Sequence, residues 1–192
     1  MGQRSRRKSK RRSPTPMILV GAGLIFVALA ATIFLPKEDV PAESSRELGF
    51  SPVTVNYAAP TLSLMDVNGT QVSLKDYRGQ LILVNHWATW CPPCKAEMPD
   101  LETYFKAHKD EGFTLIGISA GDTQEQVAEF MQAYGITFPM WLDPQESALA
   151  AFKTMNLPSS FVIDASGTVR LAWSGAISLE NLEKFVTPLI NE

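Results

Sequence analysis

The most informative stretch of the chain is LILVNHWATWCPPCKAEMP, residues 81–99. It begins with a nearly continuous apolar run over residues 81–87, which is typical of a β-strand buried on both faces. The two cysteines of the chain follow directly, as Cys91 and Cys94. Beyond them, Met98, Leu101 and Phe105 recur at helical spacing. The stretch therefore predicts a buried strand, a short loop and a helix that begins at the cysteine pair.

The spacing of the cysteines has a chemical meaning. We expect Cys91 where the strand ends and Cys94 about one turn into the helix, within disulfide range. A helix N-terminus offers unpaired N–H groups and a partial positive charge, which favour a thiolate at Cys91. One sulfur can then attack a disulfide in another protein, and the other can resolve the mixed disulfide. The pair thus predicts thiol–disulfide exchange.

The residues between the cysteines, Pro92 and Pro93, influence this chemistry. Neither proline has a backbone N–H to donate to the Cys91 sulfur, and neither adds a charge. Cys91 must therefore rely on the Cys94 N–H and the helix dipole. We expect a less stabilised thiolate, and so a lower reduction potential, than in strongly oxidising proteins of this kind. A potential near the roughly −120 mV of such an oxidant would contradict this expectation.

Strand and helix patterns alternate over residues 58–192, which predicts one α/β domain with a mixed sheet flanked by helices. Strands are expected in a hairpin over 62–74 that turns at Asn68-Gly69, and over 113–119, 160–164 and 168–173. Further helices are expected to begin near Asp122 with Glu125, at Asp143-Pro144, and at Ser178, the last with a kink near Pro188. With 45% hydrophobic residues, the chain can fill such a core.

The N-terminal part of the chain has a different composition. Residues 1–16 hold seven of the 17 Lys and Arg and no acid, so the remainder carries ten basic groups against 20 acidic ones. Residues 17–35 are uncharged and would form a helix roughly 28 Å long, close to the thickness of a bilayer's hydrocarbon core. We expect a basic cytoplasmic segment (1–16), a transmembrane signal-anchor helix (17–35) and a flexible linker (36–57). The basic head predicts that the C-terminal domain lies outside the cytoplasmic membrane.

Two other interpretations of this N-terminus are less favoured. A cleavable signal peptide could be cut after Ala28-Leu29-Ala30, but apolar residues continue to Leu35. A nucleic-acid-binding arm fits poorly, because an acidic domain would be repelled by phosphate. We therefore expect a membrane contact through residues 17–35 and no nucleic acid partner.

The segment from Asn85 to Pro99 resembles the active site of membrane-tethered thioredoxin-like proteins of the TlpA/ResA type. The similarity covers roughly residues 54–190 and includes Pro99, the helix-kinking proline, and an inserted helix and strand around 120–145. Residues 157–161, LPSSF, resemble the loop that holds the cis-proline of this family. The resemblance implies a thioredoxin-like fold, with Pro158 in the cis form facing the disulfide. Client contacts are then expected at Trp90, Pro92, Pro93, Leu157 and Pro158.

The resemblance also implies an acid/base group. Ordinary thioredoxins have a buried Asp where this chain has Asn85, which cannot titrate. The TlpA/ResA branch instead has a Glu three residues after the second cysteine, where this chain has Glu97. A buried carboxyl there could exchange a proton with Cys94. The alternative is an ordinary solvated residue in the first turn of the helix.

Other prominent side chains are given structural interpretations. Trp87 is expected in the core, and His86 is expected to be a packed and hydrogen-bonded core residue rather than a ligand. His108 is expected to be solvated on its helix. Met98 and Met131 fit the apolar faces of their helices.

The function that follows is a membrane-tethered, extracytoplasmic thiol–disulfide oxidoreductase that reduces protein disulfides. Its only redox group would be the Cys91–Cys94 disulfide, with no other cofactor and no metal. The resemblance implies a membrane electron donor of the CcdA/DsbD kind and apocytochrome c as a client. A thiol peroxidase is disfavoured because its motif would need Pro and Thr or Ser where the chain has Val84 and Ala88. A copper chaperone remains an alternative, although no obvious distal His ligand accompanies the two thiols.

Overall fold

The computed structural model describes residues 51–192, which form one α/β domain. Its strands are β1 (Val53–Ala58), β2 (Ser63–Asp66), β3 (Gln71–Ser73), β4 (Leu81–Trp87), β5 (Phe113–Ala120), β6 (Met140–Asp143), β7 (Ser159–Ile163) and β8 (Thr168–Ser174). Its helices are η2 (Leu74–Tyr77), α2 (Pro92–His108), α3 (Gln124–Tyr134), α4 (Ser147–Ala151), α5 (Leu179–Phe185) and α6 (Thr187–Ile190). The strands and long helices expected from the sequence are thus present, with small shifts at their ends.

The strands form one mixed sheet in the order β1-β8-β7-β4-β5-β6-β2-β3. Strands β4, β5 and β6 run parallel to one another at its centre. The pairs β4–β7, β7–β8, β8–β1, β6–β2 and β2–β3 are antiparallel. The expected mixed sheet is therefore confirmed, with the cysteine-bearing connection leaving the end of its central strand β4.

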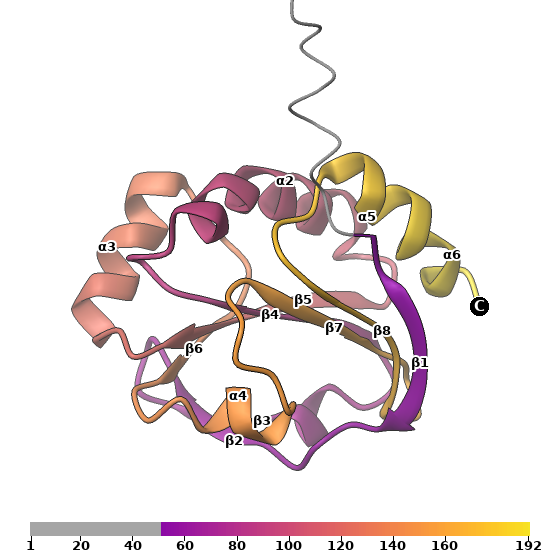
Figure 1. Ribbon diagram of the computed structural model, residues 1–192, viewed down its shortest axis with the longest axis horizontal. Coiled ribbons are helices and arrows are strands. Elements are labelled where there is room, and N and C mark those ends of the chain that lie inside the picture. The colour runs from indigo at the N-terminus through magenta and orange to yellow at the C-terminus, as the bar shows by residue number, and fades with distance from the viewer. Residues whose placement is uncertain (1–50) are drawn as a thin grey trace, which may run out of the picture. The chain divides into compact units, whose positions relative to one another are not determined.

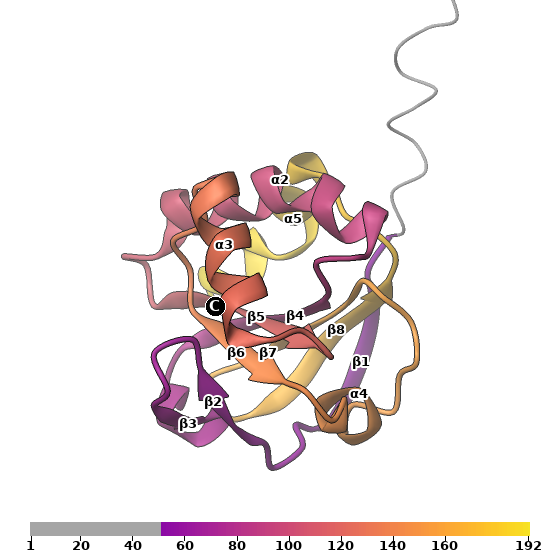
Figure 2. The ribbon, with the colours of Figure 1, turned by 90° about the vertical axis from the view of Figure 1, so that its left-hand side faces the viewer.

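Strand β4 is buried on both faces, as its apolar run predicts. Leu83 and Trp87 point into a core with α2, α3 and α5, whereas Ile82 and Val84 point into a second core that includes residues of α4 and η2. Helices α2, α3 and α5 accordingly lie over one face of the sheet, and α4 lies under the other (Figures 1 and 2). This double cover fixes the end of β4, from which the redox site is built.

Strand β1 adds an edge to the sheet that the sequence did not reveal. Residues 53–57, which we expected within the linker, form most of this strand and pair antiparallel with β8. The strand is mostly exposed, and the alternation of Val53, Val55 and Tyr57 along it was overlooked because the segment follows Pro52 and was taken as linker. The expected basic segment, the expected transmembrane helix and linker residues 36–50 lie outside the described residues. Within residues 51–192, no helix has the length and apolar character needed to cross a bilayer.

Two helix starts differ from the sequence expectations. Helix α3 is capped by Thr123 with Gln126, rather than by Asp122 with Glu125. Helix α4 begins at Ser147, four residues after Asp143, because the Asp143 carboxylate accepts the N–H groups of both Ser147 and Ala148. Aspartates that looked like local caps thus have partners that sequence spacing did not indicate. At the C-terminal end, a break at Val186 separates α5 from α6, which starts with Thr187-Pro188 and agrees with the kink expected there.

Candidate active site

The cysteine pair lies at the junction between β4 and α2. Cys91 is the N-cap of α2 with extended backbone dihedrals, and Pro92 and Pro93 occupy the first helical positions. The two sulfurs form a disulfide whose Cα atoms are 5.3 Å apart. The Cys94 N–H donates to the Cys91 Sγ at 3.4 Å, as predicted from the missing N–H groups of the prolines. Cys91 is 4% exposed and Cys94 fully buried, so Cys91 is the one cysteine of the pair with surface open to solvent.

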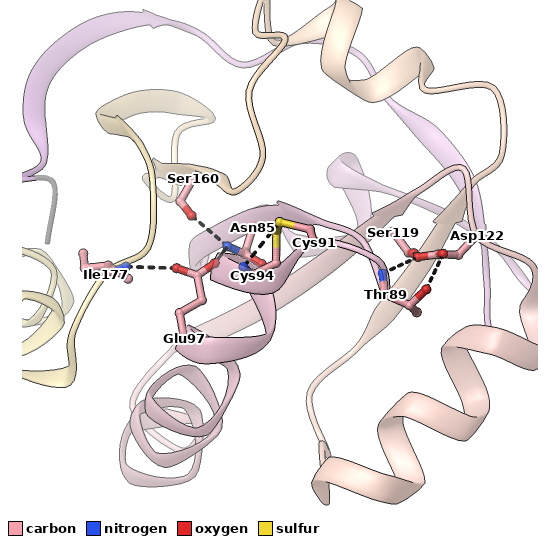
Figure 3. The surroundings of a disulfide bond; sticks show 9 residues. All are labelled: Asn85, Thr89, Cys91, Cys94, Glu97, Ser119, Asp122, Ser160 and Ile177. Atoms are coloured by element: carbon pink, nitrogen blue, oxygen red, sulfur yellow. Dashed lines mark hydrogen bonds between the residues drawn. A yellow bond between two sulfur atoms is a disulfide. The ribbon is translucent and has the colours of Figure 1, made fainter. Parts of the chain in front are cut away.

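Glu97 lies one helical turn beyond Cys94 and is buried rather than solvated, with 1% of its surface exposed. Its Oε1 accepts from Asn85 Nδ2 at 2.8 Å, and its Oε2 accepts from the Ile177 N–H at 3.0 Å (Figure 3). Asn85 Nδ2 also donates to Ser160 Oγ at 3.0 Å. The carboxyl group is therefore held between β4, β7 and the loop that precedes α5.

This burial changes the proton affinity of Glu97. Removal from water raises the pKa of Glu97 to about 8, although the hydrogen bonds from Asn85 and Ile177 act in the opposite direction. An ordinary solvated thiol has a pKa of about 8.5, which lies close to this value. Similar affinities favour proton exchange in both directions near neutral pH. The burial that an acid/base role requires is thus present.

Asn85 and its partners extend the site beyond the residues singled out in the sequence. Only the absence of a titratable group at Asn85 was noted there, whereas the side chain links Glu97 to Ser160. Nothing in the sequence pattern marks Ser160 or Ile177, because their contacts span 75 and 80 residues of chain. The Asn85 Oδ1 atom is buried and has no hydrogen-bond partner among residues 51–192.

The peptide bond between Leu157 and Pro158 is cis, as the resemblance implied. Pro158 is buried at the start of β7, and its carbonyl oxygen accepts the Gly175 N–H at 2.8 Å. Leu157 is half-buried. Because Ser159 pairs with His86 near the end of β4, the connection between α4 and β7 ends beside the strand that leads to the cysteines.

An open groove begins at the accessible sulfur. The residues that line it include Cys91 and all five expected client contacts: Trp90, Pro92, Pro93, Leu157 and Pro158. Its walls continue over Phe152, Met155 and Trp173, and it encloses about 1740 Å³. Trp90 and Met155 stand 63% and 94% exposed. We call this feature the Trp90 groove; Cys94 and Glu97 are not among its lining residues, so they lie behind it.

A second cluster of hydrogen bonds holds the other side of the cysteine loop. The Asp122 carboxylate, 3% exposed, accepts from the Thr89 N–H and hydroxyl and from the Ser119 hydroxyl (Figure 3). From the sequence, Asp122 was expected only to cap a helix. No local pattern could have revealed its contact with Thr89, because the two residues are 33 positions apart.

The two histidines differ in part from expectation. His86 is fully buried between Phe152 and Phe161, so its packing is confirmed. Its expected hydrogen bond is absent: neither ring nitrogen has a partner within the described part of the chain, although the Ser159 backbone lies near. His108, expected to be solvated, has a side chain only 12% exposed, which packs at a tilt against the Tyr104 ring and is hydrogen-bonded to Glu111. Trp87 is a core residue, as expected.

The helix-capping disulfide, the mixed sheet and the adjoining cis-proline define the molecule as a thiol–disulfide oxidoreductase with a thioredoxin-like fold. Its redox group is the Cys91–Cys94 disulfide. Among residues 51–192, no three His, Cys, Asp or Glu side chains are grouped so that they could hold a metal ion. A family model described as the AhpC/TSA family matches residues 55–172. The chain belongs to this family and, within it, to the thiol–disulfide oxidoreductases of the ResA/TlpA type.

Relatives and solved structures agree with this assignment. The thiol–disulfide oxidoreductase ResA of Geobacillus kaustophilus is 34% identical over 132 residues, which cover 69% of this chain and 76% of that protein. ResA of Bacillus subtilis is 29% identical over 178 residues, 89% of each chain. The crystal structure of a thiol:disulfide interchange protein of the thioredoxin family from Chlorobium tepidum has 31% identity and a TM-score of 0.64. It covers 72% of this chain and 99% of that one.

Proposed function

We propose that the protein is a membrane-tethered reductant of protein disulfides outside the cytoplasm, with Glu97 as its acid/base group. The observation that supports the reductive step is that the two cysteines differ in burial and position. Cys91 borders the open Trp90 groove, whereas Cys94 is fully buried one turn before a buried carboxyl group. One sulfur can therefore meet a client, and the other is kept for resolution.

The proposed reaction starts from the reduced dithiol. The Cys91 thiolate attacks one sulfur of a client disulfide, and a client thiolate leaves as the mixed disulfide forms. The Cys94 thiol then gives its proton to the Glu97 carboxylate and attacks the Cys91 sulfur. The second client thiolate leaves, so the client gains two electrons and the Cys91–Cys94 disulfide is restored. At neutral pH a group with a pKa of about 8 is ionised in about a tenth of the molecules, which can accept the Cys94 proton, and is protonated in the rest, which can return a proton when a donor reduces the disulfide.

The environment of Cys91 supports the reductive direction. Its sulfur accepts one N–H, from Cys94, and the helix begins with two prolines that offer none. A thiolate with few donors is less stabilised, which favours the disulfide form of the protein and gives the reduced form a stronger tendency to donate electrons. Because disulfides form readily outside the cytoplasm, a membrane thiol carrier of the CcdA/DsbD kind would have to restore the dithiol.

The location and the client rest on the sequence and on the relatives. The basic head of residues 1–16 and the apolar run of 17–35 support an anchor with the domain on the extracytoplasmic side. The TlpA/ResA resemblance supports apocytochrome c, whose haem-binding cysteines must be reduced before haem attachment, as a client. The contacts proposed for a client are the residues of the Trp90 groove.

Trapping of mixed disulfides tests this function. In the full-length chain, Cys94→Ala removes the resolving thiol, so clients should remain covalently attached to Cys91 and be released by reductant. We expect apocytochrome c among the trapped proteins, identified by mass spectrometry after elution. The matched control, Cys91→Ala, leaves the buried thiol and should trap none of them. Equal trapping by both variants would contradict the assigned roles, and a set without apocytochromes would contradict the proposed client.

A further inference from the structure

The Asp122 cluster is separate from the proton-exchange site, and the mechanism above does not use it. Ser119 is the penultimate residue of β5 and is the register partner of Trp87 at the end of β4. The chain turns at Gly121, whose φ of +76° favours glycine. Asp122 follows directly, and its carboxylate reaches the loop that leaves β4. The hydrogen bonds from Thr89 and Ser119 to Asp122, called the Asp122 anchor below, therefore join the ends of the parallel strands β4 and β5.

The bonds of this anchor are short and complete. Asp122 Oδ2 accepts the Thr89 N–H at 2.8 Å and the Ser119 hydroxyl at 2.5 Å, and Oδ1 accepts the Thr89 hydroxyl at 2.6 Å. Both donors of Thr89 thus go to one carboxylate. Hydrogen bonds to a charged acceptor are about twice as strong as neutral ones. The backbone of Thr89 is consequently held by a side chain from the loop between β5 and α3.

Thr89 directly precedes Trp90, which forms part of the rim of the Trp90 groove. Trp90 is 63% exposed and lines the groove together with Cys91. The loop between β4 and α2 contains only residues 88–91, and a turn bond from the Cys91 N–H to the Ala88 carbonyl at 3.2 Å closes it. In so short a loop, the conformation of Thr89 determines how Trp90 is presented. Figure 3 shows the Thr89–Asp122 pair on the side of the disulfide opposite to Glu97.

We propose that Asp122 is a positioning residue: through Thr89 it fixes the Trp90 rim of the groove and so promotes the docking of protein disulfides. This inference deepens the proposed function, because it rests on protein clients that approach Cys91 along that groove. It assigns no contact between Asp122 and the client, and no proton transfer.

The chain contains a matched control for this anchor. Glu102 of α2 accepts the Thr137 N–H at 2.8 Å and the Thr137 hydroxyl at 2.6 Å, the same two lengths as in the Asp122–Thr89 pair. Neither Glu102 nor Thr137 lines the groove. The substitutions Thr89→Val and Thr137→Val therefore remove the same hydroxyl bond and differ in what the bond holds.

The test compares two reactions of the reduced full-length protein in detergent. For Thr89→Val we expect the second-order rate of insulin disulfide reduction to fall about tenfold, mainly through a higher KM, because one charge-assisted hydrogen bond is lost. Alkylation of Cys91 by iodoacetamide, which needs no docking, should stay within about twofold of the wild-type rate. Thr89→Ser should restore insulin reduction, and Thr137→Val should leave both rates unchanged.

Further variants separate the possible outcomes. Asp122→Asn should lower insulin reduction as Thr89→Val does. The double variant should be no slower than the more affected single variant, because both substitutions disrupt the same Thr89–Asp122 contact. If Thr89→Val loses unfolding free energy like Thr137→Val but keeps its insulin rate, the anchor is structural and the inference is wrong. Trapping by Cys94→Ala with wild-type Thr89 reports on the proposed function separately, since it does not depend on this anchor.

Discussion

Among single residues, Glu97 shows how burial can create chemistry from an ordinary side chain. The same carboxyl group on the exposed face of α2 would be ionised and inert at neutral pH. Here it is held against Asn85 and Ile177 inside the domain, which brings its pKa to about 8. The cost of burying a charge is thereby turned into a proton affinity close to that of a thiol.

The acid/base role of Glu97 predicts a kinetic defect. Glu97→Gln preserves the size of the side chain but cannot take the Cys94 proton, so resolution of the mixed disulfide should slow by at least about tenfold. Acid quenching during a single turnover with insulin would show the mixed disulfide accumulating. Glu102→Gln, a buried carboxyl change on the same helix, serves as the control. Equal lifetimes of the mixed disulfide in Glu97→Gln and wild type would contradict the acid/base role of Glu97.

Burial of Glu97 also predicts how stability varies with pH. Between about pH 4.5 and pH 8 the folded protein holds a proton at Glu97 that the unfolded chain has released, so the free energy of unfolding falls as pH rises. The difference amounts to about 4 kcal/mol across this window. His86 acts oppositely: burial lowers its pKa to about 4, so it adds stability as pH rises toward 6.5.

Because Glu97 and His86 act in opposite directions, the informative quantity is the difference in unfolding free energy between the wild type and a Glu97 variant. Urea unfolding of oxidised wild type and oxidised Glu97→Gln, measured from pH 4.5 to pH 8, cancels the His86 contribution. We expect the wild type to lose stability relative to the variant at each step upward. Parallel curves would mean that the carboxyl group titrates normally.

For the helices and strands, sequence patterns were informative where the structure depends on neighbouring residues. The apolar run of β4, the Asn68-Gly69 turn and the proline-led start of α2 are local signals, and the structure has each of them. The cysteine pair and the cis-proline were likewise identified from motifs. The exact partners were not: Asp122 looked like a local cap but binds Thr89, 33 residues away, and Asp143 caps α4 from four residues before its first residue, which shifts the start of the helix. Strand β1 was missed although Val53, Val55 and Tyr57 alternate with polar residues, because the segment follows Pro52 and was assigned to the linker.

At the scale of the whole molecule, we propose that a redox domain is attached to an N-terminal membrane anchor. The Trp90 groove presents an exposed aromatic side chain beside Cys91, whereas Glu97, the proposed proton-exchange group, is buried behind it. An acidic domain behind a basic, apolar head suits a protein held at a membrane and facing away from the cytoplasm. Reduction in an oxidising compartment requires continual recharging, so the state of the dithiol in living cells reflects its direction of work.

Measuring the redox state of the Cys91–Cys94 pair in living cells tests most directly the claim that the protein is a reductant outside the membrane. Cells that express the full-length protein are quenched with acid, and free thiols are then labelled with a mass-adding alkylating reagent, so that the reduced and oxidised forms separate on a gel. In a parallel sample, a membrane-impermeant thiol reagent is added to intact cells beforehand. A reductant outside the membrane predicts a largely reduced pair that the impermeant reagent blocks. A pair that is mainly disulfide at steady state, or one that the reagent does not reach, would contradict the account.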